Sequence, residues 1–86
     1  METSLDLFEG VPAGRSTVEL DVRELPPPEP LTETMERVAS LGDNEVLLQV
    51  NDRLPQHLFP RLEENGFEHE SRELDEGVVT AIWSTG

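Results

Sequence analysis

The chain has 86 residues, with 19 acidic side chains, 6 basic ones and no cysteine, and its formal net charge is −13. This length suffices for one domain with a small core, and the lack of cysteine excludes disulfides, thiolate catalysis and zinc–thiolate sites. So acidic a chain should bind neither nucleic acid nor an anionic membrane, because both require a basic patch. With neither a secretory signal nor a run of roughly 18 apolar residues, it is expected in the cytoplasm.

Residues 1–16 show no sustained hydrophobic period and contain several glycine and proline residues. We therefore predict a flexible N-terminal tail over residues 1–16, followed by a single domain over residues 17–84. Within that domain, Thr17–Val22 alternates apolar and polar residues, which is typical of a strand with one buried face. The strand must end before Pro26–Pro28, because proline donates no hydrogen bond to a sheet.

A helix is predicted next, with Pro30 in its first turn, where the missing N–H would be unpaired in any case. Gly42 would end this helix. The following stretch, Glu45–Val50, carries apolar residues on both faces, as an interior strand does. The helix itself has apolar residues at helical spacing: Leu31, Met35 and Val38.

A second helix is predicted after the polar turn Asn51–Arg53. It should end at Asn65, with Gly66 as a left-handed cap. Pro60 lies inside this segment and donates no backbone hydrogen bond, so the helix should bend there or begin late.

Two further strands complete the predicted domain. Phe67–Leu74 is polar enough for an edge strand, and a hairpin turn at residues 75–77 joins it to Val78–Trp83. Alternation places Trp83 opposite Ile82, and we expect the indole to complete the core against the helices. The alternative is an open sheet face on which Trp83 would form an exposed apolar interface.

The element order is therefore strand, helix, strand, helix, strand, strand. Because crossovers between parallel strands are right-handed, both helices should cover the same face of the sheet. We predict an α+β fold, a two-layer sandwich with a mixed four-stranded sheet.

Two motifs resemble known families. LDVRELPPPEP at residues 20–30 is similar to the corner that carries the reactive cysteine in the TusA/SirA-like sulfur carriers of tRNA thiolation, with Pro27 in place of that cysteine. Together with NDxxPxxLxPxLEExGF at residues 51–67, it resembles the domain-of-unknown-function family 2249, a cysteine-less relative of those carriers. His57 replaces a proline of this family's pattern, and Arg53-Leu54 replaces a histidine followed by an acidic residue.

The resemblance implies the sheet order 1-2-4-3, with the fourth strand antiparallel to the other three. It also implies a link to metal, sulfur or nitrogen-oxide metabolism, because members of the family often sit beside or fused to haemerythrin-like, metal-handling or nitrogen-oxide-related proteins.

The carboxyl ends of the first two strands should meet at one rim, since these strands are parallel neighbours. Arg23 and Arg53 would both emerge there and could hold a small anion or a partner's carboxylate. Alternatively, they pair with their own neighbours, Asp21, Glu24 or Asp52. The triple proline either stiffens the corner or forms an apolar docking surface. The hypothetical binding residues are Arg23, Pro26, Pro27, Pro28, Glu29, Pro30, Asn51, Asp52, Arg53 and Pro55.

No pattern in the sequence predicts catalysis. The two histidines, His57 and His69, have no metal-ligand spacing, and no serine, histidine and acid suggest a nucleophilic triad. We therefore expect no catalytic residue, metal or cofactor, and predict a monomeric, non-enzymatic binding or adaptor module for a protein partner. The alternative is a sulfur- or redox-related carrier or enzyme with a non-cysteine mechanism or a metal on both histidines.

The acidity of the chain has two explanations. Molar salt would screen its self-repulsion, and scattered acidic residues without any lysine resemble the proteins of salt-accumulating halophilic archaea. Alternatively, the charge serves to attract a basic partner.

Overall fold

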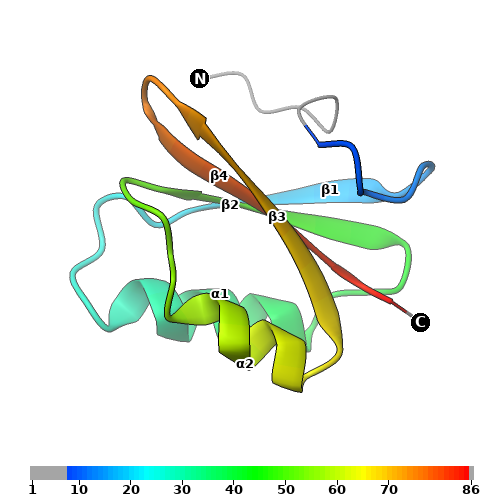
Figure 1. The fold of residues 1–86 in the computed structure, drawn as a ribbon. Coiled ribbons are helices and arrows are strands. Elements are labelled where there is room, and N and C mark those ends of the chain that lie inside the picture. Colours follow the sequence, from blue (N-terminus) through cyan, green and yellow to red (C-terminus); the bar gives the residue numbers. More distant parts are fainter. Residues whose placement is uncertain (1–7, 86) are drawn as a thin grey trace.

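The computed structural model describes residues 8–85, and its elements follow the predicted order (Figure 1). The first two strands and the helix between them come before the second helix and a terminal hairpin. The elements are β1 (Ser16–Asp21), α1 (Glu29–Ala39), β2 (Glu45–Asn51), α2 (Leu58–Glu64), β3 (Phe67–Leu74) and β4 (Gly77–Ser84). No helix in this part of the chain is both long and apolar enough to cross a membrane.

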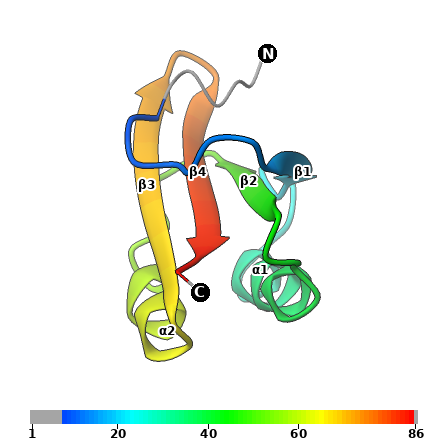
Figure 2. The same cartoon turned by 90° about the vertical axis from the view of Figure 1, so that its right-hand side faces the viewer.

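The four strands form one mixed sheet in the order β1-β2-β4-β3. β1 and β2 are parallel, whereas β4 is antiparallel to both β2 and β3. Both helices cover the same face of the sheet (Figure 2). The predicted two-layer α+β fold and its sheet order are therefore confirmed, with the polar β3 at an edge.

The helix-covered face holds one of two hydrophobic clusters. On β2 and β4, Leu47 and Ile82 lie directly opposite each other and point toward the helices. Alternation along β2 places Gln49 on this same face. The buried members of this cluster are Val38, Leu47, Leu58, Leu62 and Ile82.

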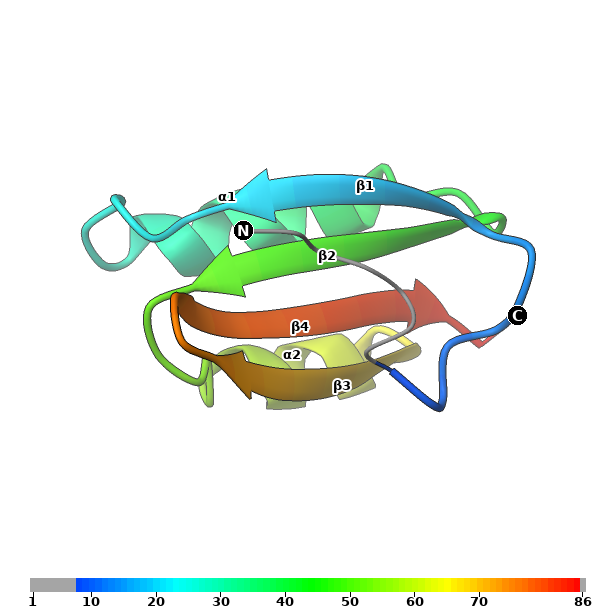
Figure 3. The ribbon, with the colours of Figure 1, turned by 90° about the horizontal axis from the view of Figure 1, so that it is seen from above.

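The second cluster lies on the opposite face of the sheet, which Figure 3 turns toward the reader, and Phe8 and Val11 of the N-terminal segment pack in it. Trp83 belongs to it and is 4% exposed. The indole is thus buried and opposite Ile82, as predicted, but the expectation that it packs against the helices is wrong. The buried members of this cluster are Phe8, Val46, Leu48, Val50, Val79, Ala81 and Trp83.

Part of the N-terminal segment packs on the domain. Phe8 is 6% exposed, and Val11 packs against the same cluster. The backbone N–H groups of Glu9 and Gly10 donate to the Glu70 carboxylate at 3.2 and 2.9 Å. The domain therefore includes residues that the sequence assigned to a flexible tail over 1–16, because an apolar sheet face without helices needs a cover. Residues 1–7 of that tail lie outside the described residues.

The helix boundaries follow the local signals with one exception. Pro30 lies in the first turn of α1, α2 begins only at Leu58, and Gly66 has φ +81° after its end. α1 ends at Ala39 rather than at the predicted Gly42, whose N–H donates instead to the Glu45 carboxylate at 2.8 Å.

Candidate functional site

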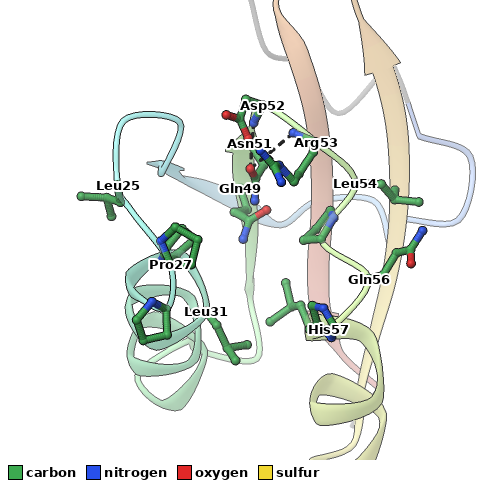
Figure 4. A pocket seen from close by; sticks show the side chains of 14 residues that line it. Leu25, Pro27, Leu31, Gln49, Asn51, Asp52, Arg53, Leu54, Gln56 and His57 are labelled. Carbon is green, nitrogen blue, oxygen red and sulfur yellow. Dashed lines mark hydrogen bonds and ion pairs between the residues drawn. The ribbon is translucent and has the colours of Figure 1, made fainter.

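A cleft of about 710 Å³ lies at the carboxyl ends of β1 and β2 (Figure 4). One wall is the β1–α1 loop with the start of α1, and the other is the β2–α2 loop. We call this site the corner cleft. Its lining residues are Leu25, Pro27, Pro28, Pro30, Leu31, Gln49, Asn51, Asp52, Arg53, Leu54, Pro55, Gln56, His57 and Leu58.

The first wall is shaped by the proline run. The N–H of Leu25 donates to the carbonyl of Val22 at 3.2 Å and begins the turn out of β1. The prolines that follow, with a cis peptide bond between Pro27 and Pro28, lead directly into α1. Because proline restricts φ, this wall presents rigid apolar rings to the cleft.

The second wall is held by a side-chain turn at Asn51. Its Oδ1 accepts hydrogen bonds from the backbone N–H groups of Asp52 (2.8 Å) and Arg53 (3.4 Å). Asparagine favours such turns because its short side chain reaches the backbone that follows it. Leu54 then stands at the rim with 38% of its surface exposed, the one exposed large apolar side chain among residues 8–85.

A buried amide forms the floor. Gln49 is 1% exposed, and its Nε2 donates to Thr34 Oγ1 of α1 at 2.8 Å. The Thr34 hydroxyl in turn donates to the Pro30 carbonyl at 2.7 Å. These two hydrogen bonds connect β2 to the first turns of α1, directly beneath the proline wall.

Most of the predicted binding residues lie together in this cleft. Pro26 and Glu29 are exposed neighbours of the lining residues along the chain. Arg23 does not line the cleft. The predicted residues that line the corner cleft are Pro27, Pro28, Pro30, Asn51, Asp52, Arg53 and Pro55.

Each of the two arginines pairs with a neighbouring carboxylate. Arg23 pairs with Asp21, with Nη2 2.7 Å from Oδ2, and its Nη1 reaches the Glu76 carbonyl at 3.4 Å. Side-chain hydrogen bonding to Arg23 holds the pKa of Asp21 below its usual value and raises the pKa of Arg23 itself. Arg53, 81% exposed at the cleft rim, lies 3.5 Å from the Asp52 carboxylate. The structure thus shows the pairing with neighbouring carboxylates that the sequence left as an alternative.

Residues 19–84 match the model of the family described as Uncharacterized conserved protein (DUF2249). The chain belongs to this family. The match spans both cleft walls and the whole of the sheet beyond the start of β1, but not the N-terminal segment that covers Trp83. Neither a search of curated proteins nor a search of solved structures found a significant match.

Several of the residues that line the cleft of this DUF2249 protein were not predicted from its sequence. The most informative of them is Gln49, which could have been recognised as a polar residue inside a strand with apolar residues on both faces. Its hydrogen-bond partner Thr34 could not have been recognised as a site residue, because threonine is common in helices. The other lining residues missed are Leu25, Leu31, Leu54, Gln56, His57 and Leu58.

The DUF2249 cleft offers groups for recognition. Asp52 and His57 are both exposed, and no hydrogen bond joins them within residues 8–85. The second histidine, His69, lies on β3, where it stacks on Phe59 at 4.2 Å between ring centroids and sits 3.0 Å from the Glu63 carboxylate. The described part of the chain contains no group of three or more potential metal-binding side chains.

Proposed function

We propose that this DUF2249 protein is a non-enzymatic binding module that recognises a partner protein through the corner cleft. The observation that carries the proposal is that the two sequence motifs, at residues 20–30 and 51–67, form the two walls of one cleft. Motifs far apart in the chain meet there and leave an apolar, open space between them.

The cleft walls suit recognition physically. Proline rings on one side and the Asn51 turn on the other hold the walls before any partner arrives, so little conformational entropy is lost on binding. Leu54 keeps an apolar side chain exposed at the rim, where a partner would remove it from water.

The proposed relation to the TusA-like sulfur carriers supports the same surface. In those carriers, partner enzymes contact the corner between the first strand and the first helix, which is where Pro27 stands here. A docking surface can persist without the thiol. We propose a link to metal, sulfur or nitrogen-oxide metabolism from the resemblance alone, a halophilic setting from the charge, and a cytoplasmic setting from the lack of cysteine.

The rival hypothesis is a sulfur- or redox-related carrier or enzyme, with either a non-cysteine mechanism or a metal on both histidines, and the histidine arm can be compared with the structure. His57 lines the corner cleft, whereas His69 is engaged with Phe59 and Glu63 beside α2. No observation favours their acting together, so the binding module remains our single proposal.

The test is a nuclear magnetic resonance titration of the isotope-labelled chain with the proteins encoded beside its gene. A cognate partner should shift the amide signals of Leu31, Gln49 and Leu58, and leave the β3–β4 hairpin unchanged. A partner that perturbs other surfaces and spares the cleft would overturn the proposal.

A matched pair of variants sharpens this experiment. Leu54→Asp places a charge on the cleft rim and should weaken partner binding at least tenfold. Ala13→Asp adds the same charge at an exposed position before β1 and should leave the affinity within about twofold. Equal effects of the two variants would mean that the added charge, not the cleft, controls binding.

A further inference from the structure

The floor of the corner cleft carries a hydrogen-bond acceptor without a partner. Gln49 is 1% exposed, yet no group in residues 8–85 donates to its Oε1. From this atom we propose that the partner anchors in the cleft through an aromatic side chain with its own donor, the indole N–H of tryptophan or the hydroxyl of tyrosine. The inference rests on the proposed function, since it names the group that the partner inserts.

The orientation of the Gln49 amide follows from its surroundings. The Thr34 hydroxyl has one hydrogen, and that hydrogen is donated to the Pro30 carbonyl at 2.7 Å. Thr34 Oγ1 therefore acts as an acceptor toward Gln49, which must present its nitrogen at 2.8 Å. An amide flipped by 180° would set the Gln49 oxygen against an oxygen with no hydrogen left to give.

The oxygen is consequently left without a donor and is almost fully buried at the floor of the cleft, so a ligand must press between the two walls to reach it. Figure 4 shows the Gln49 amide between the two walls, with its nitrogen on the side of α1 and its oxygen on the side of the β2–α2 loop. A buried acceptor that stays unpaired destabilises the unliganded state. A ligand that supplies the missing donor removes that penalty, whereas a ligand without a donor leaves it in place.

The apolar walls of the cleft favour a ligand with a flat apolar ring. Pro27, Pro30 and Leu31 on one side and Pro55 and Leu58 on the other are apolar, and the volume of about 710 Å³ admits a bicyclic ring. Tryptophan and tyrosine combine a flat apolar body with one donor, and they are the side chains that most often dominate interfaces.

A cationic anchor fits less well. An ammonium or guanidinium group buried at the floor would need a buried carboxylate beside it. The carboxylate that lines the cleft, Asp52, is exposed at the rim and lies next to Arg53. The floor therefore favours a neutral donor.

The experiment compares two small probes of nearly the same shape, indole and benzofuran. Indole has an N–H donor, whereas benzofuran has none. Each is titrated into the labelled full chain and followed by nuclear magnetic resonance. For fragments of this size we expect dissociation constants on the order of 1–10 mM for indole. Indole should bind the cleft about tenfold more tightly than benzofuran and shift the Gln49 side-chain amide signals.

Two variants with the same chemical change locate the effect. Gln49→Met removes the buried oxygen and should reduce the preference for indole to about onefold. Gln56→Met makes the same change at an exposed position of the cleft lining and should keep the tenfold preference. If Gln49→Met does not fold, the comparison of indole with benzofuran on the unmodified chain still tests the inference.

Equal binding of indole and benzofuran would overturn the inference, since the indole N–H would then gain no hydrogen bond from the Gln49 oxygen. Failure of both probes to bind the cleft would overturn it as well. Neither result would contradict the proposed function, which is tested separately by the titration with whole partner proteins. If such a partner does bind, replacing its inserted tryptophan or tyrosine by phenylalanine should weaken binding about tenfold, and an unchanged affinity would contradict the inference.

Discussion

Gly77 stands at the start of β4 in a conformation that other residues rarely adopt. Its φ is +150°, and a Cβ at this position would overlap the backbone carbonyl oxygen of Asn51 on the neighbouring strand. We expect Gly77→Ala to lower the free energy of unfolding by about 2 kcal/mol or more, because backbone strain and a steric clash add together. Denaturant unfolding measures the loss.

A second glycine provides the control for this substitution. Gly66 also has positive φ, +81°, but a Cβ there meets nothing within 4 Å. Gly66→Ala should therefore cost only the backbone term, about 1 kcal/mol. Equal losses of unfolding free energy for the two variants would show that the close approach of Gly77 to Asn51 adds nothing to the cost of the substitution.

Asp21 makes stability depend on pH in the acid range. Hydrogen bonding to Arg23 lowers the pKa of Asp21 in the folded protein. A carboxyl with a depressed folded pKa contributes stability above its unfolded pKa, and this contribution is lost as the pH falls through the folded pKa. The affected window therefore lies below about pH 4, the usual pKa of aspartate.

The expected result is a difference in slope. Between pH 5 and pH 2, the free energy of unfolding of Asp21→Asn should fall less steeply than that of the unmodified chain. Arg23→Gln should show the same reduced slope, since it removes the other member of the pair. Parallel profiles for all three proteins would contradict a role of this ion pair.

At the scale of elements, the N-terminal segment acts as the cover of the sheet face that the helices leave open. Phe8 packs in the same cluster as Trp83. Phe8→Ala should lower the free energy of unfolding by about 3 kcal/mol and shift the emission of the single tryptophan to longer wavelength as water reaches the indole. Thermal unfolding and fluorescence measure both effects.

Leu54→Ala supplies the comparison for this experiment. Leu54 is an exposed apolar residue on the cleft rim, so its truncation should change stability by less than about 0.5 kcal/mol and leave the tryptophan emission unchanged. If Phe8→Ala behaves in the same way, the segment does not cover the sheet in solution.

At the scale of the whole molecule, the net charge of −13 opposes folding through self-repulsion. Salt shortens the range of this repulsion, from a Debye length of about 10 Å at 0.1 M to about 3 Å at 1 M. Dilution from molar potassium chloride should therefore lower the midpoint of thermal unfolding substantially. Trehalose at equal osmolality should restore less of the midpoint than the salt does, because a neutral solute stabilises the fold only through its exclusion from the protein surface and screens no charge. A midpoint indifferent to salt would favour the basic partner as the reason for the acidity.

Much of the fold follows from local features of the sequence. Alternation from Thr17 to Val22, the prolines before α1 and the glycine after α2 each specify an element or its end through backbone sterics and side-chain periodicity. The parallel pairing of β1 and β2 brings both motifs to one rim, so most of the corner cleft could be predicted.

Tertiary contacts decided the rest. The sequence could not show that Phe8 would cover Trp83, because alternation separates the two faces of a strand without saying what packs on each. Arg23 bonds to Asp21 and to the Glu76 carbonyl and does not line the cleft, because Asp21 lies on the sheet face opposite the helices. The acceptor at the cleft floor exists only because α1 brings Thr34, its hydrogen already given to Pro30, against Gln49. Such a hydrogen-bond direction is a property of two elements in contact, α1 and β2, and neither element encodes it alone.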